Sequence, residues 1–230
     1  MSFCIAVDGP AGAGKSTIAK RLAGELGIVY VDTGAMYRAM AYHMIQKGTD
    51  LEDQEAVSRD CQDAEISIVY DKGEQMVLLN GENVTPYLRE ESVSGKASVC
   101  SANPDVRRRL VTLQRKFAEH TDLVMDGRDI GTCVLPDAEL KIYLTAGTHT
   151  RALRRYKELT RKGENCDLEQ IERDIAERDY RDMHREFSPL KKAADAVEVD
   201  TSDMTIGQVE EAILSLVRER RGAASESRES

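Results

Sequence analysis

Residues 3–17 read FCIAVDGPAGAGKST, so that an apolar run leads directly into a glycine-rich loop. The run 3–7 has the length and the unbroken hydrophobicity of a buried strand in a parallel sheet. A helix is predicted over 15–26, because aliphatic residues recur every four positions and Gly27 follows as a stop. The loop stands between strand and helix, and its pattern G-x-x-x-x-G-K-[ST] predicts a phosphate-binding loop.

The chemistry expected of this loop comes mainly from its backbone. Glycine lets consecutive N–H groups turn toward phosphate oxygens, and the start of the following helix adds a positive potential. Lys15 is placed to reach the β- and γ-phosphates of a nucleoside triphosphate, and the Ser16 hydroxyl to bind Mg²⁺, directly or through water. A glycine-rich turn could match the pattern by chance, but the strand and helix around it favour phosphate binding. The residues expected to contact the triphosphate are Gly9, Pro10, Ala11, Gly12, Ala13, Gly14, Lys15, Ser16 and Thr17.

The composition is typical of a soluble folded protein. The 230 residues are 41% hydrophobic and 32% charged, with a formal net charge of −9. A chain of this length buries a core without disulfides or metal, as one large domain or one domain with an insertion. The negative charge argues against nucleic-acid binding over the whole surface, and neither a membrane-helix run nor a signal-peptide pattern is present. Five scattered cysteines and four dispersed histidines predict free thiols in a reducing cytoplasm and no metal site of their own.

Beyond the loop, the pattern of the chain is strand, helix, strand, helix. This alternation is typical of an α/β three-layer fold, in which a central parallel sheet is flanked by helices. Short β-rich runs at 66–70 and 76–79 break the alternation and predict a small antiparallel insertion over 63–86. The other predicted strands are 28–31, 123–126, 140–144 and 197–199, and the other predicted helices are 33–47, 90–101, 105–120, 148–162, 168–184 and 205–220. Residues 222–230 are predicted to form a disordered tail.

The loop alone does not show how the triphosphate is used. GTPases need a guanine-reading N-K-x-D sequence, which the 230 residues lack. Motor and remodelling ATPases usually follow a hydrophobic strand with Asp-Glu, whereas Asp126 is followed here by Gly127-Arg128-Asp129, with no glutamate to activate water. These absences weaken the interpretation as a hydrolase.

Basic residues are concentrated in a few predicted helices. Segment 147–162 has six basic residues against one acidic residue, and segment 105–116 has five against one. Two triplets are spaced to share a helix face: Arg151, Arg154 and Arg155 at i, i+3 and i+4, and Arg178, Asp182 and Arg185 at i, i+4 and i+7. A solvated face laced with salt bridges is the alternative interpretation. Arginines that converge on a triphosphate would instead neutralise the charge of a phosphoryl group during its transfer.

The chain resembles the bacterial-type cytidylate kinases, or CMP/dCMP kinases, of the nucleoside monophosphate kinase group. The resemblance runs from about residue 3 to about residue 217. Many families share the P-loop, but the segments D-T-G-A-M-Y-R at 32–38 and D-G-R-D-I-G-T at 126–132 are far more specific. The other matching segments are 177–182, 188–190 and 200–202. Cys133, Leu135 and segment 87–89 depart from the usual residues, and none of them has an expected role.

The resemblance implies transfer of the γ-phosphate of ATP to CMP or dCMP, giving ADP and CDP or dCDP, with Mg²⁺. The implied catalytic residues are Lys15, Arg128, Arg151 and Arg155. The implied CMP-binding residues are Thr33, Arg38, Ser98, Arg107, Arg128, Asp129, Arg178, Asp182 and Arg185. Of these, Ser98, Arg107 and Asp129 would face the cytosine, Arg178 and Asp182 the ribose, and Arg38, Arg128 and Arg185 the phosphate.

The resemblance also implies one kinase domain over 1–221. Its parts would be a core of 1–32, 104–147 and 186–221, a monophosphate-binding region at 33–103 with the β insertion, and a lid at about 148–166 followed by the helix 168–184. The lid would close over ATP, bring Arg151 and Arg155 toward the phosphates and exclude water. A cytoplasmic monomer without nucleic-acid or membrane partners is expected.

The chemistry of cytosine agrees with these roles. Its N4 amino group is a donor that the Asp129 carboxylate can accept, whereas the O4 of uracil would face that carboxylate at a cost of about 1–3 kcal/mol. No general base is needed, because the CMP phosphate is largely ionised at pH 7, so positioning, Mg²⁺ and arginines would supply the catalysis. Two alternatives remain open: a P-loop kinase for UMP or another small acceptor, and a regulatory module that binds nucleotide and signals to a partner.

Overall fold

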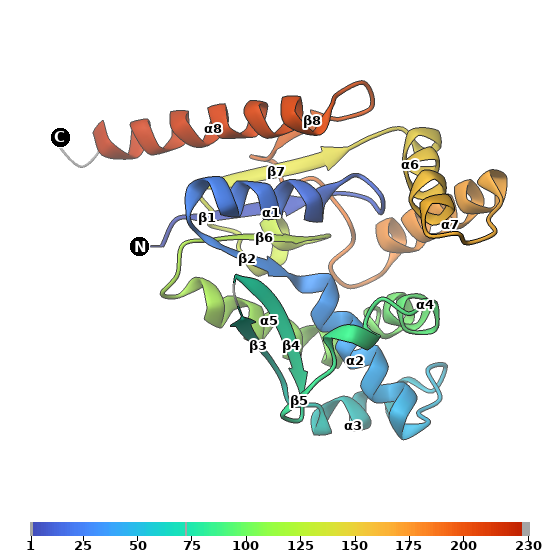
Figure 1. Ribbon diagram of the computed structural model, residues 1–230. Coiled ribbons are helices and arrows are strands. Elements are labelled where there is room, and N and C mark those ends of the chain that lie inside the picture. The colour runs from blue at the N-terminus through green and yellow to red at the C-terminus, as the bar shows by residue number, and fades with distance from the viewer. Residues whose placement is uncertain (1, 72, 227–230) are drawn as a thin grey trace. The chain divides into compact units, whose positions relative to one another are not determined.

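The computed structural model describes residues 2–71 and 73–226 (Figure 1). The described residues form two compact units, the first within ranges 1–30 and 120–230 and the second within range 31–119. The chain therefore leaves the first unit once and returns to it once.

The first unit is built on a five-stranded sheet in the order β2-β6-β1-β7-β8. Its strands are β1 (Cys4–Asp8), β6 (Leu123–Gly127), β7 (Leu140–Thr145), β8 (Val197–Asp200) and the edge strand β2 (Val29–Asp32), which crosses from range 1–30 into range 31–119. Central β1 pairs in parallel with β6 on one side and β7 on the other, and β7 pairs in parallel with β8. All five residues of β1 are buried, as its unbroken apolar run indicates. The predicted α/β fold with a central parallel sheet is confirmed.

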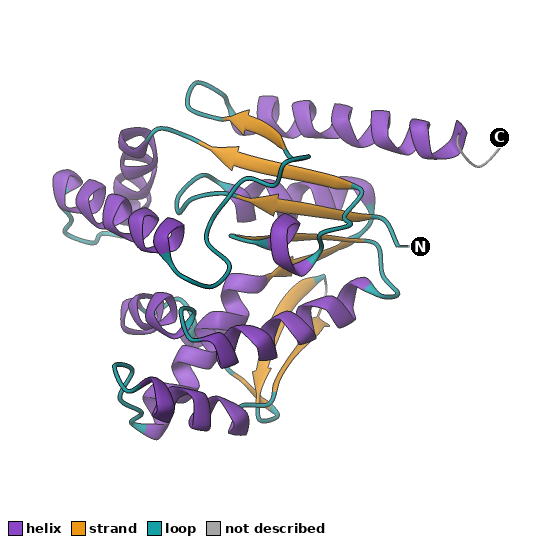
Figure 2. Ribbon diagram, turned by 180° about the vertical axis from the view of Figure 1, so that it is seen from behind, coloured by secondary structure: helices purple, strands orange, loops and turns teal. Residues whose placement is uncertain are grey.

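Two helices, α1 (Lys15–Leu26) and α8 (Ile206–Glu226), pack on this sheet (Figures 1 and 2). Ile18 and Leu22 of α1 and Ile213 and Val217 of α8 share one apolar core with β1, β6 and β7. The four-residue spacing in α1 places these aliphatic side chains on the covered face. This core holds the first turn of α1 against the end of β1.

Helix α8 extends beyond its predicted end near residue 220. It continues through Gly222 to Glu226, which corrects both the helix end and the predicted start of the tail. A helical glycine costs only about 1 kcal/mol relative to alanine, and the two alanines that follow favour helix. Residues 227–230 of the predicted tail lie outside the described residues.

Helices α6 (Thr148–Arg161) and α7 (Leu168–His184) lie side by side in the first unit (Figures 1 and 2). Their bounds agree with the predicted helices 148–162 and 168–184. His149 on α6 and Glu172 on α7 are joined by a 2.8 Å contact between Nδ1 and Oε2. The two helices are further joined by the buried pair of Arg151 and Asp179.

The second unit combines helices with a small antiparallel sheet in the order β3-β4-β5. Its elements are α2 (Thr33–Lys47), α3 (Gln54–Asp60), β3 (Ile66–Asp71), β4 (Glu74–Leu79), β5 (Glu82–Asn83), α4 (Glu91–Cys100) and α5 (Pro104–Ala118), with short helical turns at Cys61–Asp63 and Thr85–Tyr87. The predicted antiparallel strands are confirmed. Helix α3 was not predicted, although its signal is present: the Asp53 carboxylate accepts the N–H groups of Glu55 and Ala56 as an N-cap.

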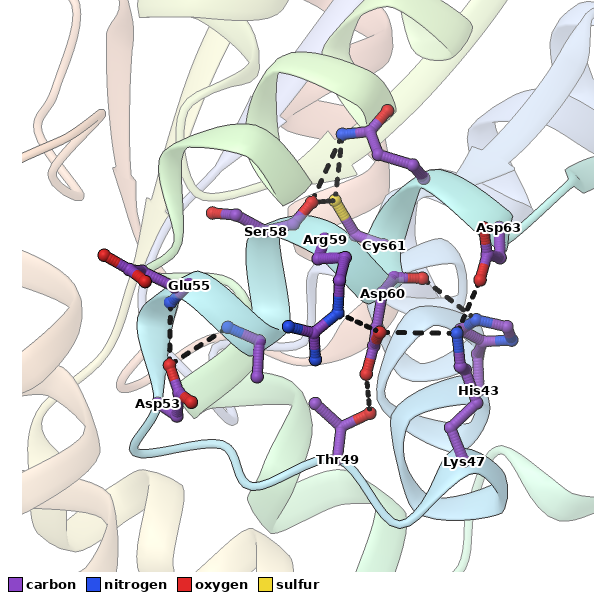
Figure 3. Close-up of polar contacts among 12 residues, drawn as sticks. His43, Lys47, Thr49, Asp53, Glu55, Ser58, Arg59, Asp60, Cys61 and Asp63 are labelled. Atoms are coloured by element: carbon purple, nitrogen blue, oxygen red, sulfur yellow. Dashed lines mark hydrogen bonds and ion pairs between the residues drawn. The ribbon is translucent and has the colours of Figure 1, made fainter.

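A polar cluster fastens the end of α2 to α3 (Figure 3). The Asp60 carboxylate accepts from Thr49 at 2.8 Å and lies 3.3 Å from Lys47 Nζ, which also pairs with Asp63. The Asp60 carbonyl contacts His43 Nε2 at 3.1 Å. Burial lowers the pKa of His43 and so favours the neutral form of its ring. The cluster is structural and holds the C-terminal end of α2.

Candidate functional site

Three glycines shape the phosphate-binding loop. Gly9, Gly12 and Gly14 have φ of +147°, +76° and +91°, values that glycine adopts more readily than other residues. A Cβ at position 9 would lie 1.9 Å from the carbonyl oxygen of Leu144, and one at position 12 would lie 3.2 Å from the Cβ of Arg151. Helix α1 begins directly after Gly14, so the predicted order of strand, loop and helix is confirmed.

Lys15 is buried inside this loop. Its Nζ donates to the Pro10 carbonyl at 2.8 Å. Burial, reinforced by the charge of Arg128, lowers the pKa of Lys15 to about 7, although the Asp126 carboxylate opposes the shift. An anion beside Nζ would favour the charged amine again, so the loop suits a ligand that brings negative charge.

Ser16 contacts a carboxylate that had no predicted role. Its hydroxyl donates to Asp126 Oδ2 at 2.8 Å, and the Tyr30 hydroxyl donates to Oδ1 at 2.9 Å. Asp126 is buried near the carboxyl end of β6, beside β1. Its place could have been anticipated, because neighbouring parallel strands bring their carboxyl ends to one edge of the sheet.

The oxygens of Ser16 and Asp126 are the kind of ligand that Mg²⁺ prefers. Among the described residues, no group of three or more His, Cys, Asp or Glu side chains is placed to hold a metal ion. The pair therefore fits an ion that takes its remaining ligands from nucleotide phosphates and water.

Asp8, the last residue of β1, fastens the segment that follows β6. Its Oδ1 accepts the N–H of Ile130 at 2.8 Å and its Oδ2 accepts that of Gly131 at 2.7 Å. Residues 130–134 form a single π-helical turn, an irregularity frequent at functional sites. Burial raises the pKa of Asp8 to about 6 against the opposing effect of these two hydrogen bonds. Asp8 thus fixes the backbone directly after Asp129.

Two ion pairs connect this segment with the end of α7. Arg128 Nε donates to Asp182 Oδ2 at 2.9 Å, and Arg185 Nη2 lies 3.7 Å from Asp129 Oδ1. Burial alone would raise the pKa of Asp182, but the charges of Arg128, Arg178 and Arg185 outweigh it and lower the pKa. The structure therefore brings together five of the predicted CMP-binding residues.

Arg185 does not lie on the helical face predicted for it. The helix ends one residue earlier, and Arg185 has the extended values φ −65° and ψ 144°. Its Nε donates to the Ser188 carbonyl at 2.5 Å, and the N–H of Leu190 binds the Asp182 carbonyl at 2.8 Å. The chain folds back on the last turn of α7, so the shared helical face is correct only for Arg178 and Asp182.

Arg151 reaches from α6 into the phosphate-binding loop. Its Nη1 donates to Asp179 Oδ2 at 2.6 Å and to the Ala11 carbonyl at 2.9 Å, and its Nε donates to the Ala146 carbonyl at 2.8 Å. Arg151 and Asp179 are 4% and 7% exposed. Asp179 had no predicted role, and no local pattern pairs it with a side chain 28 residues away.

The other two arginines of the predicted α6 triplet have different partners. Arg154 donates to the hydroxyl and carbonyl of Thr201, at 3.0 and 2.6 Å. Arg155 is half-exposed, with Nη1 2.9 Å from Glu158 Oε2. The predicted common face is wrong for the guanidinium groups, because long side chains on adjacent positions reach separate partners.

In the second unit, the N-terminal end of α2 carries Thr33 and Arg38. Thr33 is buried, and Arg38 Nη2 donates to Asp32 Oδ2 at 3.0 Å. Asp32 also caps the helix, with Oδ1 accepting the Ala35 N–H at 2.9 Å. Gln75 of β4 accepts the Asp32 N–H at 2.8 Å and donates to its carbonyl at 3.3 Å. The β insertion thus supports the start of α2 through Gln75. The sequence of the insertion did not indicate this role.

Ser98 and Arg107 belong to α4 and α5 of the same unit. Arg107 is buried, with its guanidinium carbon 5.3 Å from the centroid of the Tyr37 ring. Its Nη1 donates to the Ser101 carbonyl at 3.2 Å, and the Ser101 hydroxyl donates to the Ser98 carbonyl at 2.9 Å. These contacts gather Ser98, Arg107 and α2 within one unit.

Comparison with known proteins identifies relatives over nearly the whole chain. Residues 5–219 match the family model for cytidylate kinase. The cytidylate kinase of Ligilactobacillus salivarius is 50% identical over 94% of this chain and 96% of its own, and that of Geobacillus thermodenitrificans is 48% identical over 96% and 98%. A gluconokinase structure from Sinorhizobium meliloti, 12% identical over 98% of this chain and 97% of its own, has a TM-score of 0.51 and supports the fold alone. Across the described residues, no helix is long and apolar enough to cross a membrane.

Proposed function

The chain belongs to the cytidylate kinase family, and on this basis we propose that it transfers the γ-phosphate of ATP to CMP or dCMP, giving ADP and CDP or dCDP. The observation that carries this proposal is the family match over residues 5–219, which includes the phosphate-binding loop and the Arg128–Asp129 segment. The geometry supports it, since buried cations and paired arginines suit two phosphate-bearing substrates.

On the donor side, we assign the ATP phosphates to the loop residues 9–17. Their N–H groups and the start of α1 would bind the phosphates, with Lys15 beside the group in transfer. Ser16 and Asp126 would hold Mg²⁺, directly or through water. When bound, this ion neutralises charge on the β- and γ-phosphates.

On the acceptor side, the first unit would supply Arg178 together with four residues that the two ion pairs hold, Arg128, Asp129, Asp182 and Arg185. Asp129 would accept the cytosine N4 amino group, Arg178 and Asp182 would bind the ribose, and Arg128 and Arg185 the phosphate. Because the pairs at 2.9 and 3.7 Å orient their four side chains before CMP arrives, less ordering is needed on binding.

The second unit would supply the remaining acceptor contacts. Arg38, held by the Asp32 carboxylate, would bind the CMP phosphate, with Thr33 at the start of the same helix. Ser98 and Arg107 would face the cytosine. Contacts within the second unit support the places of Arg38, Ser98 and Arg107.

We further assign the lid to residues 148–166, followed by the helix 168–184, and the monophosphate-binding region to 33–103. The core would be 1–32, 104–147 and 186–221. Arg151 and Arg155 would stabilise the phosphoryl group once the lid closes and excludes water. The ionised CMP phosphate needs no general base.

We expect the protein to carry out this reaction as a cytoplasmic monomer, without nucleic-acid partners.

An acceptor panel tests the proposal. With ATP and Mg²⁺, the wild-type protein should phosphorylate CMP and dCMP, with UMP poorer by about 5- to 150-fold, the ratio that corresponds to 1–3 kcal/mol. Asp129→Asn should narrow the preference for CMP over UMP, whereas Asp195→Asn, which alters a carboxylate paired with Lys141, should leave it unchanged.

The panel also separates the alternatives. Negligible turnover of CMP beside rapid use of another acceptor would replace the proposed substrate. Transfer to no nucleotide at all, with nucleotide-dependent binding of a protein partner, would indicate a regulatory module. An unchanged acceptor ratio in the Asp129 variant would show that another residue recognises the base.

A further inference from the structure

Ser188 has a left-handed backbone that its sequence context disfavours. Its φ is +49°, and among the described residues the only other non-glycine residue with positive φ is Asn80. Residues other than glycine, asparagine and aspartate rarely adopt this backbone region. Pro189 follows, and a residue before proline normally prefers an extended backbone. Such strain persists only where surrounding contacts hold it, often at functional sites.

Three contacts hold the turn at Ser188. Its carbonyl accepts Arg185 Nε at 2.5 Å, and its hydroxyl donates to Cys133 Sγ at 3.4 Å. Just beyond it, the N–H of Leu190 donates to the Asp182 carbonyl at 2.8 Å. The turn therefore lies against the last turn of α7 on one side and the segment after β6 on the other.

The turn fixes the orientation of one guanidinium group. Arg185 is held at Nε by the Ser188 carbonyl and faces the Asp129 carboxylate with Nη2, 3.7 Å from Oδ1. The side chains of Arg185 and Asp129 are 8% and 5% exposed, so neither moves freely in solvent. Because a guanidinium group is planar, contacts at two of its nitrogens set the direction of the third.

We propose that Ser188 is a positioning residue for the acceptor phosphate, acting through the carbonyl that its left-handed backbone turns back onto Arg185. This inference rests on the proposed function, in which Arg185 binds the phosphate of CMP. The feature that matters is the backbone conformation, because the carbonyl, not the side chain, contacts Arg185. If the turn served only to end α7, substitutions in it would lower the stability of the protein without raising the KM for CMP relative to the KM for ATP.

Substitutions at position 188 test the role of the backbone. Valine and threonine are β-branched and oppose positive φ, whereas glycine adopts it without strain. Ser188→Val and Ser188→Thr should raise the KM for CMP by about tenfold or more, with the KM for ATP within about twofold of wild type. In Ser188→Gly the KM for CMP should stay within about threefold of the wild-type value, although this variant lacks the hydroxyl.

Asn80 provides the matched control. It has φ +50° in the turn between β4 and β5, and although it lies within the proposed monophosphate-binding region, its hydrogen bonds are to Glu65, which has no proposed binding role. Asn80→Val introduces the same kind of strain, so it should lower the melting temperature while leaving both KM values unchanged. If Ser188→Val does not fold, Ser188→Thr takes its place, with CMP affinity measured directly by calorimetry.

Several results would overturn the inference. They are a wild-type KM for CMP in both β-branched variants, a glycine variant as impaired as these, and a parallel rise in both KM values. Failure of the proposed function has a different signature: the wild-type protein itself would not phosphorylate CMP in the same assay.

Discussion

Asp8 should make the stability of this protein depend on pH in an unusual direction. Both of its carboxylate oxygens accept backbone N–H groups, yet it is 5% exposed, and burial raises its pKa from the ordinary 3.8 to about 6. The folded state therefore holds the Asp8 proton more tightly than the unfolded state does. The destabilising effect is absent below pH 3.8, grows as pH rises between these two pKa values and is complete above pH 6.

The expected magnitude follows from these two pKa values. Ionising Asp8 costs the folded state about 1 kcal/mol at pH 4.5 and about 3 kcal/mol at pH 7.5. Asp8→Asn removes this titration. The asparagine amide can accept only one of the two N–H groups, which adds a cost of roughly 1–3 kcal/mol at every pH. The stability difference between wild type and Asp8→Asn should therefore move by about 2 kcal/mol toward the asparagine variant from pH 4.5 to pH 7.5.

Urea denaturation of both proteins across this pH range measures the shift, since titrating groups that do not interact with Asp8 cancel in the difference. Asp182→Asn is the matched control, because Asp182 is also a buried aspartate but has a lowered pKa beside Arg128. Stability from a lowered pKa is present above the unfolded value and lost as pH falls, so that variant should show the opposite slope. A pH-independent difference for Asp8→Asn would refute the raised pKa.

Three further predictions concern the phosphate-binding loop. Gly9→Ala should lower the free energy of unfolding by about 3 kcal/mol or more, because its Cβ would lie 1.9 Å from the Leu144 carbonyl oxygen; a loss below about 1 kcal/mol in urea would contradict this. Asp179→Leu leaves the buried Arg151 charge unpaired and should cost about 3–5 kcal/mol by the same measurement, and a neutral effect would contradict the 2.6 Å ion pair. ATP binding at pH 8 should be accompanied by proton uptake, because burial lowers the pKa of Lys15 to about 7 and leaves the amine mostly neutral until phosphates approach. Calorimetry in two buffers measures this uptake, and uptake that persists in Lys15→Met would assign it elsewhere.

The elements set by local patterns were predictable. The apolar run of β1, the four-residue spacing of α1 and the start of α2 after Asp32 agree with the structure, because strands and helices reflect local periodicity and capping. The short helix α3 was not predicted because seven residues carry little periodic signal. The end of α8 was misplaced because residues 222–230 contain no aliphatic residue larger than alanine and so lack the apolar periodicity that indicates a helix.

The contacts that orient the candidate site were less accessible. The Arg151–Asp179 pair and the Ser16–Asp126 hydrogen bond join residues 28 and 110 positions apart, so only the packed sheet and helices bring them together. The separate partners of Arg154 and Arg155 also depend on tertiary neighbours, since helix spacing fixes Cβ directions and not the ends of long side chains.

The contact between Gln75 and Asp32 bears on how the β insertion can change during evolution. Gln75 bonds both backbone groups of Asp32, while the Asp32 side chain caps α2 and holds Arg38. A lineage that shortened or exchanged this insertion would lose the partner of Asp32 and loosen Arg38 at the same time. The β insertion and the start of α2 are therefore expected to change together during evolution, because the loss of one would weaken the other.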